Sequence, residues 1–310
     1  MAGDVVREEN PENKKGAALI AEWDETPFIK GSALFLGAFI TLIALSWAVE
    51  LPLKLGFEWL EEQAMVACLG LVLGIVFIRY PAGGGRRRHA IPWYDAILSL
   101  VGLGVALWLI IIYEDIELNP FAMRDQMFWI SVVLLPLVWE ALRRTAGLSL
   151  TIIFSFFVLY AFLGHLVPGE MFKGVEQAPY RLIAELGTNN ASILGLPLKI
   201  IVLTVVLFIW MGQLLLHTGA SEWFTDVAAA MMGRSRGGSA KIAVVASGFF
   251  GSISGSAVAN VASTGVITIP LMKQAGYDAK SSGAIEAVAS TGGQIMPPIM
   301  GAAAFLMAEI

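Results

Sequence analysis

The sequence predicts an all-α integral membrane protein: a multi-span helical bundle with a re-entrant helical hairpin followed by a broken (unwound) transmembrane helix. Three observations support this fold class. The 310-residue chain is 57% hydrophobic and only 15% charged, whereas a typical soluble domain carries about 25% charged residues. Six apolar stretches are each long enough to cross a bilayer. Two further apolar stretches are interrupted by glycine and proline.

The six spans are expected where about 20 predominantly apolar residues follow one another, which is the length that crosses the hydrocarbon core. Tryptophan and tyrosine lie near several of the ends, as interfacial anchors do. The expected spans are residues 31–49, 62–78, 93–113, 126–142, 148–167 and 194–216.

The charges between the spans predict the orientation of the chain. Arginines follow the second, fourth and sixth spans, for example Arg86, Arg143 and Arg234, while the intervening loops are acidic. Positive residues accumulate on the cytoplasmic side of a membrane. We therefore expect a multi-pass protein of the cell inner membrane, embedded in lipid, with its polar N-terminal tail in the cytoplasm.

Several function classes are not supported by the sequence. Cys68 is a lone cysteine inside an apolar run, and the three histidines lack metal-ligand spacing. There is no HExxH or P-loop motif, and the net charge of −5 is small. The sequence therefore predicts no enzyme, no catalytic residue, no cofactor and no nucleic-acid partner.

The re-entrant hairpin is expected at about residues 242–272. This stretch of 31 residues holds no charge and is bracketed by Lys241 and Lys273. As one helix it would be roughly 46 Å long at ~1.5 Å per residue, too long for one straight span and too short for two. Interior glycines make a continuous helix poor. A hairpin that enters and leaves on the cytoplasmic side fits better, with its tip within residues 252–259.

The broken helix is expected at about residues 281–308. This stretch is long enough to span, but Gly292, Gly293 and the pair Pro297–Pro298 interrupt it. Two successive prolines remove two backbone donors, and the second disfavours the helical conformation of the first. The pattern predicts two half-helices joined by an unwound linker near the middle of the membrane.

The two breaks share a sequence: VASTG at residues 261–265 recurs at 288–292. Small residues at this spacing also serve tight helix packing. Packing alone, however, does not require glycine and proline pairs in one linker, and non-helical backbone at this depth needs protein or a water-filled cavity around it. Freed carbonyls and hydroxyls suit sodium, and half-helix N-termini suit anions. The breaks therefore predict a binding site.

Three polar residues beside the breaks leave alternatives open. Glu286 is an ionisable residue inside a span, which is a functional candidate by default, but a solvated position near the cytoplasm fits it equally. Asn260 and Gln294 flank the two breaks. Each could brace the linker backbone or contact a ligand.

Three motifs carry a resemblance to a known family: residues 251–260 (GSISGSAVAN), 268–273 (TIPLMK) and 286–309, which contain STGGQIMPPIMG. They resemble the membrane component of tripartite ATP-independent periplasmic (TRAP) transporters, in particular the fused permease that works with TAXI-type solute-binding proteins. The resemblance is strongest over residues 196–310.

This resemblance implies a domain order. Residues 1–30 would be the cytoplasmic tail, 31–145 a four-span module like the small subunit, and 146–240 the scaffold spans of a large-subunit-like module. Independently of the resemblance, apolar residues near helical spacing predict an amphipathic helix over 221–232, a connector that would brace the next element. Residues 241–310 would be the first half of the transport domain. The family has a second, inverted copy of the hairpin and broken helix, so we expect this sequence to be the N-terminal part of a longer permease.

The resemblance also implies sodium-driven import of an organic acid anion, such as a dicarboxylate or an amino-acid-like carboxylate. A periplasmic TAXI-type binding protein would deliver the substrate, and an elevator-like domain would carry it. The implied substrate- and ion-binding residues are Gly251, Ser252, Ser254, Gly255, Ser256, Asn260, Ser290, Thr291, Gly292, Gly293 and Pro297. Sodium would be held by Ser254, Ser256, Thr291 and Gly292. A channel that uses the hairpin as a selectivity loop is the alternative.

Overall fold

The structure is a computed structural model, and it describes residues 26–56, 59–83, 91–167, 173–297, 300, 301, 304, 307 and 308. All regular structure within these residues is helical, and six of the helices are long and apolar enough to cross a membrane. These findings confirm the all-helical, multi-span prediction. Most of the predicted polar tail and the arginine-rich segment 84–90 lie outside the described residues.

The chain divides into two compact units, the first of which comprises the residues up to Phe39 and Val66–Ile193. Its core forms where small residues let helices approach closely. A methyl group on Gly70 of α4 would lie 2.4 Å from the Ala106 Cβ of α5. The helices of this unit are the first part of α2 (Pro27–Ala48), most of α4 (Glu61–Arg79), α5 (Trp93–Leu118), α6 (Arg124–Ala146), α7 (Leu148–Leu163), the 3-10 turn η1 (Gly164–Leu166) and α8 (Pro179–Thr188).

The short helix α8 packs closely against α6. Pro179 starts the helix, a position where its missing N–H costs nothing. The Ser131 hydroxyl of α6 donates to the Ala184 carbonyl at 3.0 Å, and Gly187 leaves no room there for a side chain. The Tyr180 ring stacks on Phe128 at 4.4 Å between ring centroids. Helix α8 therefore braces α6 through both polar and aromatic contacts.

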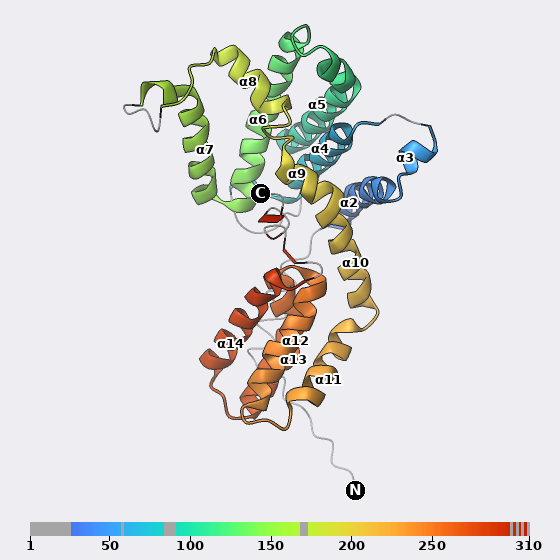
Figure 1. Cartoon of the computed structure of the whole chain (residues 1–310), viewed down its shortest axis with the longest axis vertical. Coiled ribbons are helices and arrows are strands. Elements are labelled where there is room, and N and C mark those ends of the chain that lie inside the picture. Colours follow the sequence, from blue (N-terminus) through green and yellow to red (C-terminus); the bar gives the residue numbers. More distant parts are fainter. Residues whose placement is uncertain are drawn as a thin grey trace. The chain divides into compact units, whose positions relative to one another are not determined.

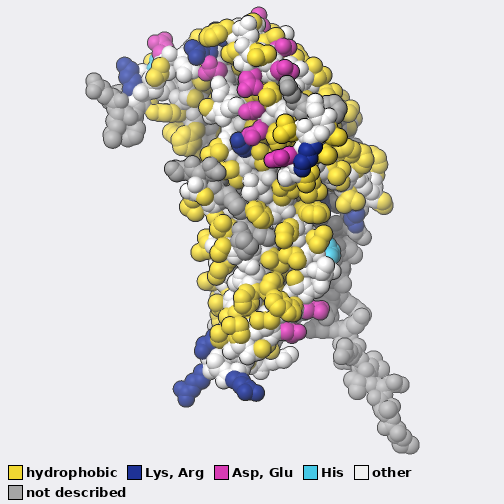
Figure 2. Space-filling model, turned by 45° about the vertical axis from the view of Figure 1, so that its right-hand side comes forward, with side chains coloured by type: hydrophobic (Ala, Val, Ile, Leu, Met, Phe, Trp, Pro, Cys, Tyr) yellow, Lys and Arg dark blue, Asp and Glu magenta, His cyan; other side chains and the backbone are white. Residues whose placement is uncertain are grey.

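Helix α7 exposes its apolar side chains on nearly all sides. Only Thr151 of this helix is buried, whereas Ile152, Phe156 and Leu159 are each more than half exposed. Figure 2 shows hydrophobic side chains spread over much of the visible face of the protein. A helix that is hydrophobic all round belongs in a membrane or in the core of a large protein, which fits α7 as a lipid-facing span.

The second unit comprises Ile40–Met65 and the chain from Leu194 onward. The predicted sixth span is one continuous rod that includes a turn of π-helix, and Figure 1 shows α12, α13 and α14 side by side. The remaining elements of the unit are α3 (Leu51–Lys54), α9 (Leu196–Ile200), the π turn η2 (Ile201–Val205), α10 (Val206–His217), α11 (Ala220–Met232), α12 (Gly238–Ser254), α13 (Ala257–Gln274), α14 (Ala279–Gly292) and the 3-10 turn η3 (Gly293–Ile295).

Helix α11 covers the segment that the sequence predicts to be an amphipathic helix. Its Ala228 is fully buried beside Ile242 and Ala246 of α12. Phe224 stacks on Phe249 of α12 with a centroid distance of 5.7 Å. On the other side of the helix, Trp223 is 62% exposed. The helix therefore braces the start of the hairpin with one face and leaves its other face available to lipid.

The third span extends further than its hydropathy predicts. The expected end was residue 113, but α5 continues to Leu118 and includes Glu114, Asp115 and Glu117. Hydropathy marks the part of a helix that lies in an apolar solvent, whereas the backbone hydrogen bonds continue to a capping residue. Here the Asn119 N–H donates to the Asp115 carbonyl at 2.9 Å.

The N-terminus of α14 is capped by Asp278, whose carboxylate accepts from the backbone N–H groups of Lys280 and Ser281 at 3.1 and 3.2 Å. Hydrogen bonds from Ser281, first from its side chain and then from its backbone, hold the pKa of Asp278 below its usual range. A lowered folded-state pKa contributes stability above the unfolded value, about 3.9. That contribution is lost as the pH falls through the lower folded value.

Thermal unfolding in detergent is therefore expected to become easier as the pH falls below about 4. Asp278→Asn keeps a good N-cap residue without the titrating charge, so its midpoint should change less over the same pH interval. Midpoints measured by differential scanning fluorimetry across that interval test this. Identical pH dependence in the two proteins would contradict the assignment.

Candidate functional site

The hairpin turns at two residues whose backbone conformations end one helix and begin the next. Gly255 ends α12 with φ 59°, in the left-handed region that glycine adopts without strain. Ser256 then begins α13, and its hydroxyl accepts from the Ala259 N–H at 3.3 Å. The turn lies inside the range 252–259 predicted for the hairpin tip. At the end of the hairpin opposite the tip, α12 and α13 are still in side-chain contact, because Ile242 of α12 and Leu271 of α13 pack in one cluster.

Helix α14 ends at the predicted glycine pair. The helix includes Gly292, Gly293 begins the 3-10 turn η3, and Met296 is extended. Pro297 follows in an exposed turn, while Pro298 lies outside the described residues. Helices usually end before a proline because its ring disfavours the helical conformation of the preceding residue. Most of the predicted second half-helix also falls outside the described residues, so its form stays a prediction.

The hairpin and the segment after α14 meet at backbone distance. A Cβ atom on Gly251 of α12 would lie 2.2 Å from the Cα of Gly293. A Cβ atom on Gly293 would lie 2.7 Å both from the Gly251 Cα and from the amide nitrogen of Asn260. No side chain larger than hydrogen fits at either position. This contact brings the two predicted breaks together.

A second close approach lies at the tip itself. A Cβ atom on Gly255 would lie 1.9 Å from the Met300 carbonyl oxygen. Gly255 therefore needs to be glycine for two independent reasons: its positive φ and this neighbour. Beside it, the Gly301 N–H donates to the Gln294 carbonyl at 2.6 Å. The backbone at Met300 and Gly301 thus lies directly against the hairpin tip.

Asn260 braces this arrangement from inside. It is fully buried, and its amide nitrogen donates to the Ser247 carbonyl at 2.8 Å and to the Ser290 carbonyl at 3.4 Å. These bonds tie the two arms of the hairpin to each other and to α14. Gln294, in contrast, is exposed.

The other predicted site residues differ in their surroundings. The Ser254 hydroxyl is buried and has no hydrogen-bond partner in the described part of the chain. Ser252 and Thr291 donate to carbonyls of their own helices, at Phe249 and Ala287. Gly292 has open space around it, and Pro297 is exposed. The structure therefore places Ser254, Gly255 and Gly293 at the junction, and Thr291 and Pro297 on its outer side.

The repeated VASTG segments do not occupy equivalent positions. Thr264 of the first copy is buried between helices, whereas Thr291 of the second is exposed. From the second copy it is Ser290 that faces inward, with its hydroxyl 3.1 Å from Glu286. The identity of the two segments therefore reflects a shared need for small residues more than a shared set of contacts.

Glu286 is the polar residue whose place the sequence left open. It is fully buried, and its carboxylate contacts four hydroxyl groups from three helices. These are Thr264 at 2.6 Å, Thr268 at 2.5 Å, Ser290 at 3.1 Å and Ser247 at 3.3 Å. The sequence places Thr264 and Thr268 four residues apart, on one face of a helix, and so indicates a polar face. Nothing in the sequence indicates that this face packs against Glu286.

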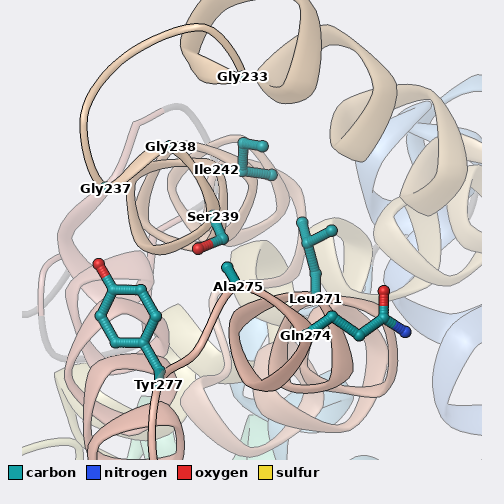
Figure 3. A pocket seen from close by; sticks show the side chains of 9 residues that line it. All are labelled: Gly233, Gly237, Gly238, Ser239, Ile242, Leu271, Gln274, Ala275 and Tyr277. Carbon is teal, nitrogen blue, oxygen red and sulfur yellow. The ribbon is translucent and has the colours of Figure 1, made fainter.

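A cavity of about 460 Å³ lies at the opposite end of the hairpin from its tip (Figure 3). It is bounded by the glycine-rich turn between α11 and α12 and by the end of α13. Figure 3 shows Ser239 and Tyr277 on one side and Gln274 on the other. None of the predicted site residues lines it, so it is separate from the junction of the two breaks.

Comparison with known proteins identifies a family that the sequence matches. Residues 133–310 match the family described as "Tripartite ATP-independent periplasmic transporter, DctM component". No solved structure matches the chain.

Three curated relatives illustrate the similarity. The isethionate TRAP transporter permease protein DctMQ of Oleidesulfovibrio alaskensis is 30% identical over 158 residues, covering 48% of this chain and 24% of that protein. The sialic acid TRAP transporter permease protein SiaT of Haemophilus influenzae is 33% identical over 96 residues, or 31% and 16% of the two chains. The C4-dicarboxylate TRAP transporter large permease protein DctM of Rhodobacter capsulatus is 28% identical over 100 residues, or 32% and 23%.

The matched segments span between 16% and 33% of the length of the curated relatives. The family match covers more than half of this chain and includes the hairpin, α14 and the junction between them. The chain is a multi-pass membrane protein and belongs to the DctM family of TRAP transporter large permeases.

Proposed function

We propose that this chain is the permease component of a sodium-coupled, binding-protein-dependent transporter that imports an organic acid anion. The observation that carries the proposal is the backbone contact between the hairpin tip and the segment after α14, at Gly251, Gly255 and Gly293. Two helix breaks that meet in this way expose backbone groups at one point, as transporter binding sites do. Both breaks lie within the family match.

The junction offers chemistry for both the ion and the anion. The buried, unpartnered Ser254 hydroxyl supplies an oxygen for sodium, and Ser256, Thr291 and the Gly292 carbonyl are the further oxygens in our proposal. The N-terminus of α13 begins at Ala257 and presents a positive dipole end to a carboxylate. No arginine lies within residues 242–272 or 281–308, so backbone amides are the groups proposed to hold the anion here.

In the membrane, we propose that α12 and α13 form a re-entrant hairpin and that α14 is the first half of the broken span. The hairpin and α14 would move together as an elevator-like domain. We further propose the fused, TAXI-type architecture, with a periplasmic TAXI-type binding protein as partner and further permease sequence completing the site. The sequence resemblance supports this, and the arginine-rich loops support a cytoplasmic N-terminus in the inner membrane.

Uptake into proteoliposomes tests the proposal. Radiolabelled organic acids, including dicarboxylates, would be offered to the full-length permease with its binding protein, with and without an inward sodium gradient. We expect uptake that saturates and that requires both sodium and the binding protein. Large unitary currents in planar bilayers would instead indicate the channel alternative. The three relatives described above are all named as permeases, which does not favour a channel.

A matched pair of variants locates the ion site. Ser254→Val removes the buried hydroxyl at the tip, and we expect about a tenfold rise in the sodium concentration needed for half-maximal uptake, equivalent to about 1.4 kcal/mol. Ser263→Val makes the same change on α13, away from the tip, and should leave the sodium dependence unchanged. Uptake that ignores both sodium and the binding protein would refute the mechanism.

A further inference from the structure

Glu286 is a fully buried carboxyl group, and among the described residues no cationic side chain pairs with it. It lies on α14 and faces α12 and α13. Within the described part of the chain, no lysine, arginine or histidine pairs with it, and all of its recorded polar partners are hydroxyls. An isolated ionised carboxylate is costly to bury, and such a group is either compensated or neutral. The gain or loss of one proton at Glu286 therefore changes whether a charge is buried between the three helices.

The hydroxyls around Glu286 can accommodate both protonation states. The Thr268 hydroxyl lies 2.5 Å from Glu286 Oε2 and 3.0 Å from the Thr264 carbonyl of its own helix. A hydroxyl has one proton to donate. If it donates to the carboxylate, Glu286 is ionised. If it donates to the Thr264 carbonyl, its lone pair faces Oε2, and the short contact is satisfied by a proton on Glu286.

Thr264 has the same choice on the other carboxyl oxygen. Its hydroxyl lies 2.6 Å from Glu286 Oε1 and 2.9 Å from the Asn260 carbonyl. Each threonine can thus turn its proton toward Glu286 or toward its own helix without moving a heavy atom. A cluster that serves both states by rotating hydroxyls has the chemistry of a proton-binding site.

The spacing of the oxygens favours a proton over a metal ion. A cation such as Ca²⁺ sits about 2.3–2.6 Å from each of its oxygen ligands, which holds those oxygens apart around the ion. Here two threonine oxygens are within direct hydrogen-bond distance of the carboxylate.

The absence of a side chain at Gly265 lets the Glu286 side chain pack closely against α13. A Cβ atom on Gly265 of α13 would lie 3.2 Å from the Glu286 Cγ and 3.6 Å from its carboxyl carbon. The carboxyl group therefore packs directly on the backbone of α13, between its two threonine partners.

The charged and titratable groups on the surrounding elements are all elsewhere. None of them forms a hydrogen bond or ion pair with Glu286 in the described residues. They are Lys241 on α12, Lys273 on α13, Asp278 and Lys280 at the start of α14, Tyr277 before it, and Glu222 and Asp226 on α11.

We propose that Glu286 binds and releases a proton within the hairpin bundle. The proton comes from water and returns to water, and the threonine hydroxyls reorient as it does so. Because the carboxyl group joins α14 to both arms of the hairpin, its protonation state changes the packing between them. The use of this proton in transport rests on the proposed function, whereas proton binding itself does not.

Infrared spectroscopy of the purified, lipid-reconstituted protein tests proton binding without transport. On acidification in choline chloride, wild type is expected to gain the carbonyl-stretch band of a water-excluded carboxylic acid. Glu286→Gln should lack this band, and Glu222→Gln, the same change at an exposed acid on α11, should keep it. Thr268→Val should keep the band but shift its frequency, because one hydrogen bond to the acid is lost.

Two results would overturn the proposal. One is a set of carboxylic acid bands identical in wild type and Glu286→Gln. The other is a Glu286 band that disappears when sodium replaces choline at constant pH, which would assign the carboxylate to sodium. If Glu286→Gln does not fold, the Thr268→Val shift still decides, since an unchanged spectrum there contradicts a proton shared with Thr268.

A transport measurement then asks whether the proton is coupled. With substrate and sodium held constant, an inward proton gradient of one pH unit should raise wild-type accumulation by up to about tenfold for one coupled proton. Glu286→Gln should not respond. If no uptake occurs under any condition, the proposed function fails while the infrared result stands by itself.

Discussion

Gly293→Ala is expected to lower the stability of the protein sharply, whereas Gly292→Ala is expected to leave it unchanged or slightly raised. The two glycines are adjacent at the end of α14, but only Gly293 lies against the backbone of another helix. The added methyl group at Gly293 would meet the Gly251 Cα and the Asn260 amide nitrogen, each at 2.7 Å. Real Cβ atoms do not approach other atoms so closely, so α12 and η3 must separate.

The expected cost is about 3 kcal/mol, at the upper end for an overpacked core, because the obstructing atom on α12 is backbone and cannot rotate away. At Gly292 nothing lies within 4 Å, and alanine is the better helix former. Unfolding midpoints of both variants in the same detergent, by heat and by denaturant, measure the difference. Equal midpoints would show that the hairpin and α14 do not meet as the structure has them.

A companion variant checks the same contact from its other side. Gly251→Ala places its methyl group 2.2 Å from the Gly293 Cα, so it should cost at least as much as Gly293→Ala. The double variant should lose less stability than the two single losses added together, because the helices have already separated after the first change.

Arg144→Leu is expected to destabilise the first unit by about 3–5 kcal/mol, the usual cost of breaking a buried ion pair by removing one partner. The Arg144 side chain is 2% exposed and donates to Asp95, which is fully buried, at 2.8 Å. The same guanidinium donates to Glu140 at 2.7 Å and to the Tyr80 carbonyl at 3.1 Å. One side chain therefore joins α5, α6 and the chain after α4.

Arg143→Leu is the matched control for this prediction. Arg143 also pairs with Glu140, at 2.7 Å, but its side chain is 28% exposed and water can replace part of what it loses. We expect a clearly smaller loss than for Arg144→Leu, because ion pairs that remain accessible to water contribute little. Combining Asp95→Leu with Arg144→Leu should recover part of the stability, since a buried pair can often be replaced by apolar residues. Similar midpoints for the two arginine variants would contradict this account.

Much of the fold could be predicted from local sequence. The six spans follow from runs of apolar residues, because a bilayer requires length and hydrophobicity and little else. The turn at Gly255 and the end of α14 at Gly292–Gly293 also follow from residues that favour them locally. The motifs at 251–260 and 286–309 were sufficient to indicate the family that the match over residues 133–310 confirms.

The parts that sequence reasoning missed are those that depend on how helices rotate against each other. Hydropathy gave the apolar part of the third span but not the helical turn that carries Glu114 and Glu117. The internal repeat suggested two equivalent segments, yet Thr264 is buried and Thr291 is exposed. A repeat fixes composition, whereas exposure depends on which side of each helix meets a neighbour.

Local sequence patterns were enough to predict that this chain crosses a membrane, which segments do so, where the last two apolar segments are interrupted, and which family it resembles. The contact of Gly251 with Gly293, and the enclosure of Glu286 by hydroxyls from three helices, became visible only in the packed structure. The physical reason is the range of the interactions. Hydropathy, capping and the conformational preferences of glycine and proline act within a few residues, whereas contacts between helices depend on the rotation and depth of each one, which no local pattern specifies.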